Sequence, residues 1–221
     1  MIQFSFWDIL SNLLIATQWT IILSLIAFVC GGIVGLILLF MRTSQIKPLE
    51  WFTKTYIEFF QGTPLLMQLF LFFFGVALFG IDVDPWIAAW LALTFWTSAF
   101  LTDIWRGCVE AMPAPQWEAA ECLAFTRWQT LSLVIIPQAV RLSLPPTIGF
   151  LVQIIKMTSL ASVIGFVELT RAGQIINNSI FQPFLVFSLV GALYFCLCYP
   201  LSRWSEAMEN RLNVRRSVDH R

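Results

Sequence analysis

Three long runs of this chain contain no Asp, Glu, Lys or Arg: residues 19–41, 63–81 and 180–202. A hydrocarbon core about 30 Å thick is crossed by roughly 20 helical residues, so each run is long enough to span a bilayer. Backbone groups within lipid must bond inside their own segment, which favours helices. The sequence therefore predicts an all-α integral membrane protein.

Two further runs complete the predicted helical bundle. Residues 85–104 are shorter and rich in tryptophan, and residues 142–167 are interrupted by two adjacent prolines and by Lys156. The sequence shows no internal repeat and no second domain. We therefore predict about five transmembrane helices in a single domain over residues 1–221, with the two termini on opposite sides of the membrane.

The composition agrees and excludes other classes of protein. Hydrophobic residues make up 58% of the chain, charged residues 12%, and the mean hydropathy is +0.78, outside the range of soluble domains. The 13 basic and 13 acidic residues balance, so no net charge favours nucleic acid. Phosphate-loop, paired-histidine and serine-elbow motifs are absent, and the cysteines lack zinc spacing. We expect no enzyme site, no cofactor and no metal.

Basic residues are distributed unevenly among the predicted loops. Lys and Arg follow the first, third and fifth spans, whereas Arg171 alone lies on the other side and residues 1–18 contain neither. Basic residues near span ends remain cytoplasmic. This distribution predicts a periplasmic amino terminus and a cytoplasmic carboxyl terminus.

Residues 113–138 form a polar segment between the third and fourth spans, on the predicted cytoplasmic side. Within residues 116–130, Trp117, Ala120 and Leu123 recur at helical spacing while other faces are polar. This pattern predicts an amphipathic helix in the cytosol. Two roles fit it: a docking surface for a partner protein, or a helix resting on lipid headgroups.

Three segments carry a family resemblance. They are residues 56–70 (YIEFFQGTPLLMQLF), the polar loop with its Glu118-Ala119-Ala120 triplet, and residues 156–162 (KMTSLAS). In this order they resemble the transmembrane permease subunit of ABC importers for polar amino acids, and the likeness runs from about residue 19 to the carboxyl end. The chain departs from the family pattern at Gln61, where the family has arginine, and at Ala124, where it has glycine.

The resemblance implies a bacterial inner-membrane protein that is not itself an enzyme. ATP would be hydrolysed by separate ABC ATP-binding subunits. These subunits would bind the cytosolic helix of the polar loop, called the coupling helix in this family. The contact residues implied are Glu118, Ala119, Ala120, Ala124 and Pro137. The other implied partners are a second permease, identical or similar, an extracytoplasmic substrate-binding protein, membrane lipid and a polar amino acid substrate.

Gly62 and Thr63 are one candidate part of the substrate path. Gly62 permits a break in the backbone, and Thr63 before Pro64 is predicted to cap a helix that restarts there. The free N–H groups of such a start suit an anionic substrate group. The alternative is an ordinary span start at the membrane boundary.

Lys156, with Thr158 and Ser159 close by, is the other candidate. A charge at the bilayer centre costs roughly 2.5–3.5 kcal/mol on insertion scales, so Lys156 is expected to face the bundle interior. There it would line the path or pair with Glu58 or Asp103. The alternative is a shorter span from which Lys156 reaches the interface.

Two rival functions remain open. A secondary, ion-coupled transporter would need intramembrane carboxylates for its coupling ion, and the three uncharged runs hold none. Asp103 and Glu168, at predicted span ends, are expected to be solvated. A membrane-embedded enzyme or a scaffold would not need the exposed loop.

Overall fold

The computed structural model describes residues 5–44 and 46–219, and this part of the chain is helical apart from short connections. The predicted all-α class is confirmed. In chain order the elements are α1 (Phe6–Thr43), α2 (Lys47–Gly62), α3 (Leu65–Phe70), the π-helical η1 (Leu71–Gly75), α4 (Pro85–Glu110), α5 (Ala114–Cys122), α6 (Arg127–Gln129), the π-helical η2 (Thr130–Ile135), α7 (Ile136–Met157), the 3₁₀-helical η3 (Thr158–Ile164), α8 (Leu169–Ile180) and α9 (Pro183–Asp219).

Four described helical stretches are long and apolar enough to cross a membrane. They are Phe6–Thr43, Pro85–Glu110, Arg127–Ile164 and Pro183–Leu212. The number rises to five if Lys47–Gly62 and Leu65–Gly75, which bend by 101° at their junction, count as one broken span. The expectation of about five spans is therefore met with this bent pair included.

The junction of α2 and α3 lies at Thr63 and Pro64. Both residues have extended backbone, with ψ of 138° and 134°, and proline has no N–H to continue a helix. α3 has six residues and η1 has five, so the two together are about half as long as a membrane span. Residues 63–81 thus do not form the single straight span expected. The predicted N-cap role of Thr63 is also wrong, because Thr63 ends α2 and Pro64 precedes α3.

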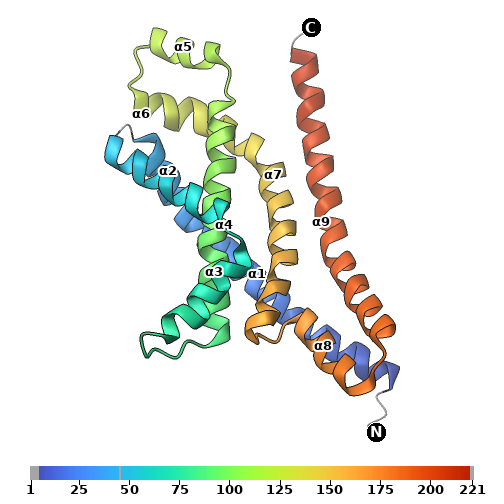
Figure 1. Ribbon diagram of the computed structural model, residues 1–221. Coiled ribbons are helices and arrows are strands. Elements are labelled where there is room, and N and C mark those ends of the chain that lie inside the picture. Colours follow the sequence, from blue (N-terminus) through green and yellow to red (C-terminus); the bar gives the residue numbers. More distant parts are fainter. Residues whose placement is uncertain (1–4, 45, 220–221) are drawn as a thin grey trace.

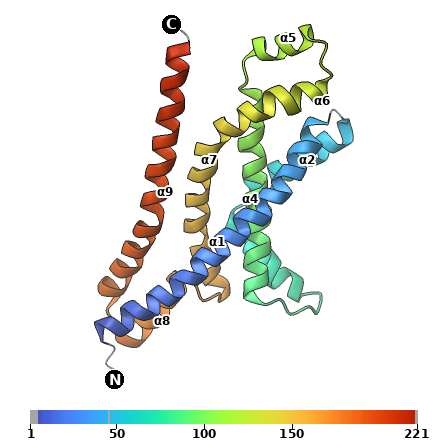
Figure 2. The same cartoon turned by 180° about the vertical axis from the view of Figure 1, so that it is seen from behind.

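The central helix is α4, and α1 crosses it diagonally (Figure 1, and from behind in Figure 2). Gly31 and Gly35 of α1 allow the close approach: a Cβ atom on Gly31 would lie 2.6 Å from Thr97 Cγ2. Thr102 Oγ1 also donates a hydrogen bond to the Gly35 carbonyl (3.1 Å). Small residues four apart let membrane helices pack backbone to backbone.

The main apolar core lies between α1, α3, α4, α7 and η3, and a second cluster joins α1, α8 and α9. Pro145 and Pro146 lie inside α7 without ending it. Beside them, Ser205 Oγ of α9 donates to the Pro145 carbonyl (2.7 Å), which ties α9 to α7.

The two ends of the molecule carry different elements (Figure 1). At one end lie α5, α6 and the described end of α9. At the opposite end lie the start of α1, α8 and the connection between η1 and α4. The polar loop is thus held outside the helical bundle, at the end toward which α9 runs.

Candidate functional site

The polar loop contains two helical pieces rather than one. α5 ends at Cys122, and the chain turns into a new helix after Thr126. The Thr126 N–H donates to Gln129 Oε1 (2.8 Å), and Thr126 Oγ1 accepts from the Gln129 N–H (3.4 Å). This reciprocal cap fixes a helix start at residue 127, so the predicted single amphipathic helix over residues 116–130 is wrong.

The backbone at the end of α5 explains why the family pattern has glycine where this chain has Ala124. The Phe125 N–H donates to the Ala120 carbonyl (3.1 Å) and the Ala124 N–H to the Glu121 carbonyl (2.9 Å), the two bonds of a Schellman motif. Ala124 has a φ of +56°, a left-handed conformation that glycine adopts without cost. The family pattern's glycine therefore matches the backbone here.

The two faces of α5 have different surroundings. Glu118 and Ala119 are exposed, whereas Ala120 is only 2% exposed. The inner face packs on η2, next to a cluster that includes Met112 and Ile135. Of the triplet, Glu118 and Ala119 can therefore contact a partner, and Ala120 contacts the protein itself.

The remaining loop residues are exposed, and α5 is tied to the membrane helices. Ala124 and Pro137 both lie on the surface. Gln138 Nε2 of α7 donates to Gln116 Oε1 of α5 (3.2 Å). This bond links α5 to a helix that enters the membrane.

At the junction of α2 and α3, a residue that sequence reasoning missed organises the backbone. Gln68 is 3% exposed, and its Nε2 donates to the carbonyls of Phe60 (2.9 Å) and Thr63 (3.1 Å) and to Thr63 Oγ1 (2.9 Å). Its amide N–H groups replace the backbone donors that the carbonyls of Phe60 and Thr63 lose at the helix break. Its sequence signals are an amide within an otherwise apolar run and its place in the family-like segment 56–70. The predicted backbone break after Gly62 is confirmed by the 101° bend between α2 and the segment that begins at Leu65.

The structure does not bring Lys156, Thr158 and Ser159 into one polar site. Lys156 is exposed and Thr158 is fully buried. The hydroxyls of Thr158 and Ser159 donate to the carbonyls of Ile155 and Lys156 (2.7 Å each), so both are engaged with their own helix.

Lys156 forms no ion pair within the described chain. The predicted pairing is wrong because Glu58 pairs with Lys54 (3.8 Å) and Asp103 with Arg106 (2.7 Å). The contact between α3 and η3 is apolar, since Leu65, Leu69, Ala161 and Ile164 share the main core. The two candidate halves of the substrate path therefore do not meet through their polar groups in this one chain.

Glu168 is buried, which corrects the expectation that it is solvated. It is 0% exposed and caps α8, accepting from the N–H groups of Thr170 (2.8 Å) and Arg171 (2.9 Å). The Tyr194 hydroxyl of α9 also donates to it (2.8 Å). Burial raises the pKa of this carboxyl, although these hydrogen bonds oppose the rise. An acidic residue just before the amphipathic residues 169–180 is the sequence signal for such a cap.

Among residues 5–44 and 46–219, no group of three or more His, Cys, Asp or Glu side chains is placed to hold a metal ion.

Comparison with known proteins decides the family. Residues 27–214 match the family model described as the inner membrane component of binding-protein-dependent transport systems. The chain belongs to this family. It is the membrane permease component of an ABC transport system, which works with an ATP-binding subunit and with permease partners. ATP hydrolysis resides on the separate subunit, and the inner membrane location is that of the family.

Individual relatives agree with this. The chain is 36% identical over 214 residues to an L-cystine transport system permease of Bacillus subtilis, covering 96% of this chain and 90% of the relative. It is 30% identical to a glutamine transport system permease of Escherichia coli, with 94% and 96% covered. A crystal structure of an amino acid ABC transporter superposes with a TM-score of 0.88 at 31% identity, covering 95% of this chain and all of that one. A methionine ABC transporter, at 19% identity and a TM-score of 0.65, shares the fold. Nothing favours the secondary-transporter alternative.

Proposed function

We propose that this permease serves an importer of a polar amino acid and that α5 is the coupling helix contacting the ATP-binding subunit. The substrate class is supported by relatives whose names specify cystine, glutamine and nopaline transport.

The observation that carries the coupling role is the two-faced packing of α5. Its exposed face presents Glu118 and Ala119, and its inner face is fixed by the buried Ala120. The bond between Gln116 and Gln138 connects α5 to α7. A partner pressing on Glu118 would therefore act on a membrane helix rather than on a loose loop.

The orientation belongs to the same proposal. The excess of basic residues follows the spans that lead to the α5 end of the molecule, and such residues remain cytoplasmic. We therefore assign α5 and the carboxyl end to the cytosol. The opposite end, with the start of α1, faces the periplasm and a substrate-binding protein.

Reversal of charge at Glu118 tests the coupling role. Glu118→Lys should abolish ATPase activity stimulated by an amino-acid-loaded binding protein, because like charges across an interface cost several kcal/mol. The assay is ATP hydrolysis by the reconstituted assembly in proteoliposomes, run with a panel of amino acids that also reports the substrate.

A matched control is Glu206→Lys, which makes the same charge change at the same end of the molecule, on α9. Glu206 is exposed and pairs with Arg203 (2.8 Å), a surface pair worth at most about 1 kcal/mol. Glu206→Lys should retain stimulated hydrolysis. Wild-type coupling in both variants would refute the assignment of α5.

A further inference from the structure

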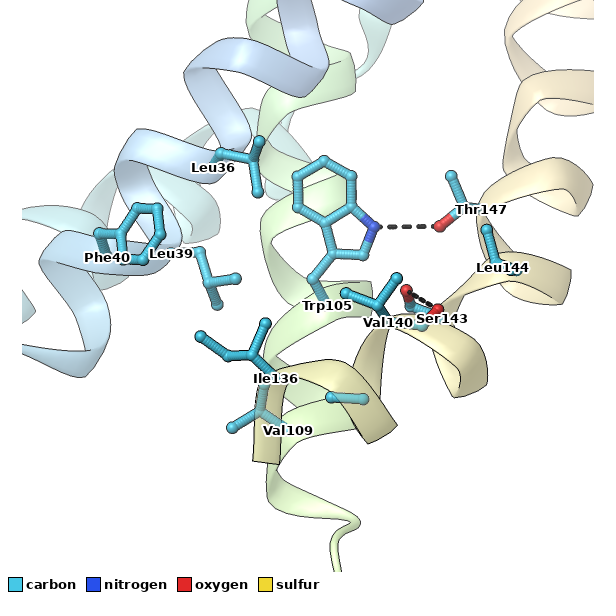
Figure 3. Close-up of a pocket in the computed structure, with 11 residues that line it drawn as sticks. Leu36, Leu39, Phe40, Trp105, Val109, Ile136, Val140, Ser143, Leu144 and Thr147 are labelled. Carbon is cyan, nitrogen blue, oxygen red and sulfur yellow. Dashed lines mark hydrogen bonds between the residues drawn. The ribbon is translucent and has the colours of Figure 1, made fainter. Parts of the chain in front are cut away.

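An apolar slot of about 280 Å³ lies between α1, α4 and α7 (Figure 3). Its walls include Leu36 and Phe40 of α1, Trp105 of α4, and Val140 and Leu144 of α7. Leu36, Phe40, Val140 and Leu144 are each more than 40% exposed, so the slot opens on the outer surface of the chain.

The polar side chains in this slot take part in hydrogen bonds within the protein. Trp105 Nε1 donates to Thr147 Oγ1 (3.0 Å), and Ser143 Oγ donates to the Val140 carbonyl (2.9 Å) (Figure 3). A ligand in the slot would meet mainly hydrocarbon side chains. The slot therefore suits an apolar chain and not a polar solute.

A second hollow of about 430 Å³ is also lined by Phe40 and lies toward the α5 end of the molecule. It is lined by Thr43, Ser44, Arg127 and Trp128. Arg127 is exposed and borders a hollow that also holds Glu50 and Glu110. Those two carboxylates pair with Arg42 and Arg106, and no carboxylate in the described part of the chain lies within ion-pair distance of Arg127. The Trp128 ring, 64% exposed, lies 6.3 Å from the Phe40 ring, and tryptophan favours the headgroup layer.

We propose that the two hollows form a binding site for an anionic phospholipid of the cytoplasmic leaflet. One acyl chain occupies the slot between α1, α4 and α7, and the phosphate lies against Arg127. Arginine binds phosphate through charge-assisted hydrogen bonds, and basic pockets between membrane helices on the cytoplasmic side recognise anionic headgroups.

The dimensions agree with a lipid. Leu36 lies eight residues before Ser44, about 12 Å along a helix, and the hydrocarbon of one leaflet is about 15 Å deep. The assignment to the cytoplasmic leaflet rests on the orientation in the proposed function. The lipid contacts α1, α4 and α7 together, so it would stabilise the α1–α4 crossing near the loop that carries α5.

Lipid binding to the purified permease with its ATP-binding subunit tests this directly, by native mass spectrometry in mixed micelles. Phosphatidylglycerol should bind more tightly than phosphatidylcholine. Arg127→Gln should weaken phosphatidylglycerol binding about tenfold and phosphatidylcholine binding less, because the choline cation already offsets the charge of its phosphate. Val140→Phe, which fills the slot from an exposed position, should weaken both.

Arg211→Gln is the matched control, because Arg211 is also exposed and unpaired within the described chain but lies on α9, away from both hollows. It should bind both lipids like the wild type. Inorganic phosphate at millimolar concentration should not displace phosphatidylglycerol, because the acyl chain holds the lipid. Displacement by phosphate would mean a simple anion site and would overturn the lipid assignment.

Unchanged phosphatidylglycerol binding in both Arg127→Gln and Val140→Phe would also overturn it. A cysteine at Val140 that cross-links to a second permease copy, and is not labelled by a photoactivatable phosphatidylglycerol, would show that this face is a subunit interface. These measurements need neither ATP nor substrate. A negative result for lipid binding would therefore not contradict the importer function. Loss of stimulated ATP hydrolysis would likewise not contradict the lipid site.

Discussion

Ala124 ends α5 in a left-handed conformation, with a φ of +56°. An L-residue with a Cβ atom is disfavoured there by about 1–2 kcal/mol, whereas glycine is not. Because Ala124 is exposed and its N–H already completes the Schellman motif, the side chain contributes little in return. This unfavourable backbone conformation destabilises the loop that bears Glu118.

We therefore predict that Ala124→Gly stabilises the permease by about 1 kcal/mol. The measurement is thermal unfolding of the purified assembly, supported by slower hydrogen exchange at the end of α5. Ala119→Gly is the control, because Ala119 lies inside α5, where glycine should destabilise by about 1 kcal/mol. A lower melting temperature for Ala124→Gly would contradict the backbone argument.

Three elements meet at Glu168, whose buried carboxyl joins α8 to α9. It caps α8 and accepts from Tyr194 of α9, while the adjacent Leu169 N–H donates to Thr20 Oγ1 of α1 (3.1 Å). Glu168→Ala would leave buried donors unpaired and remove the cap, at a cost of about 2–4 kcal/mol. Glu168→Gln keeps the side-chain volume and one of the two acceptor oxygens, although its NH₂ group would face the other helix N–H, so it should lose less than Glu168→Ala, as thermal unfolding of both variants would show.

The same carboxyl gives stability a pH dependence. Its pKa is raised by burial in the folded protein, so between the ordinary and the raised pKa the folded state binds more protons than the unfolded state. Stability should therefore fall as pH rises through this window and change no further above it. In Glu168→Gln this component should vanish. An unchanged pH profile in that variant would assign the dependence to other groups.

At the scale of elements, the crossing of α1 and α4 depends on glycine. Gly31→Ala would place a Cβ atom 2.6 Å from Thr97 Cγ2 and 3.1 Å from the Thr94 carbonyl oxygen, so the two helices must shift. Overpacking of this kind costs about 1–3 kcal/mol. We predict lower thermal stability and reduced yield of folded permease.

Gly32→Ala is the matched control, since the nearest atoms to its Cβ would be 3.8 Å away, an ordinary contact. It should leave stability unchanged or slightly higher, because alanine favours helix over glycine. Equal losses in Gly31→Ala and Gly32→Ala would indicate a propensity effect along α1 and would exclude the close contact with α4 as the cause.

At the scale of the whole molecule, the chain has two ends that differ in charge and elements. The turn that holds Asp84 and the described end of α9 lie at opposite ends (Figure 1). With the five native cysteines replaced, a cysteine near Arg211 should react with a membrane-impermeant maleimide only from the cytoplasmic side. One near Asp84 should react only from outside. Labelling of both from one side would refute this topology.

The sequence alone determined the class of protein, because long uncharged runs in lipid can only be helices. It also located the exposed polar loop and the helix break beside Gly62 and Pro64, since glycine and proline act through local backbone chemistry. The motif order in residues 56–70, 118–137 and 156–162 was enough to indicate the permease family.

Tertiary structure decided what depends on partners distant in sequence. Residues 63–81 are apolar enough for a span, yet the extended Thr63 and Pro64 let α3 fold back at 101° to α2 and pack on α4 and η3. Glu168 stands at a span end like a solvated residue, but Tyr194, 26 positions later, covers it. The outward position of Lys156 and the inward position of Ala120 likewise follow from how neighbouring helices pack, because hydrophobic periodicity gives a residue's face on its helix and not what that face will meet.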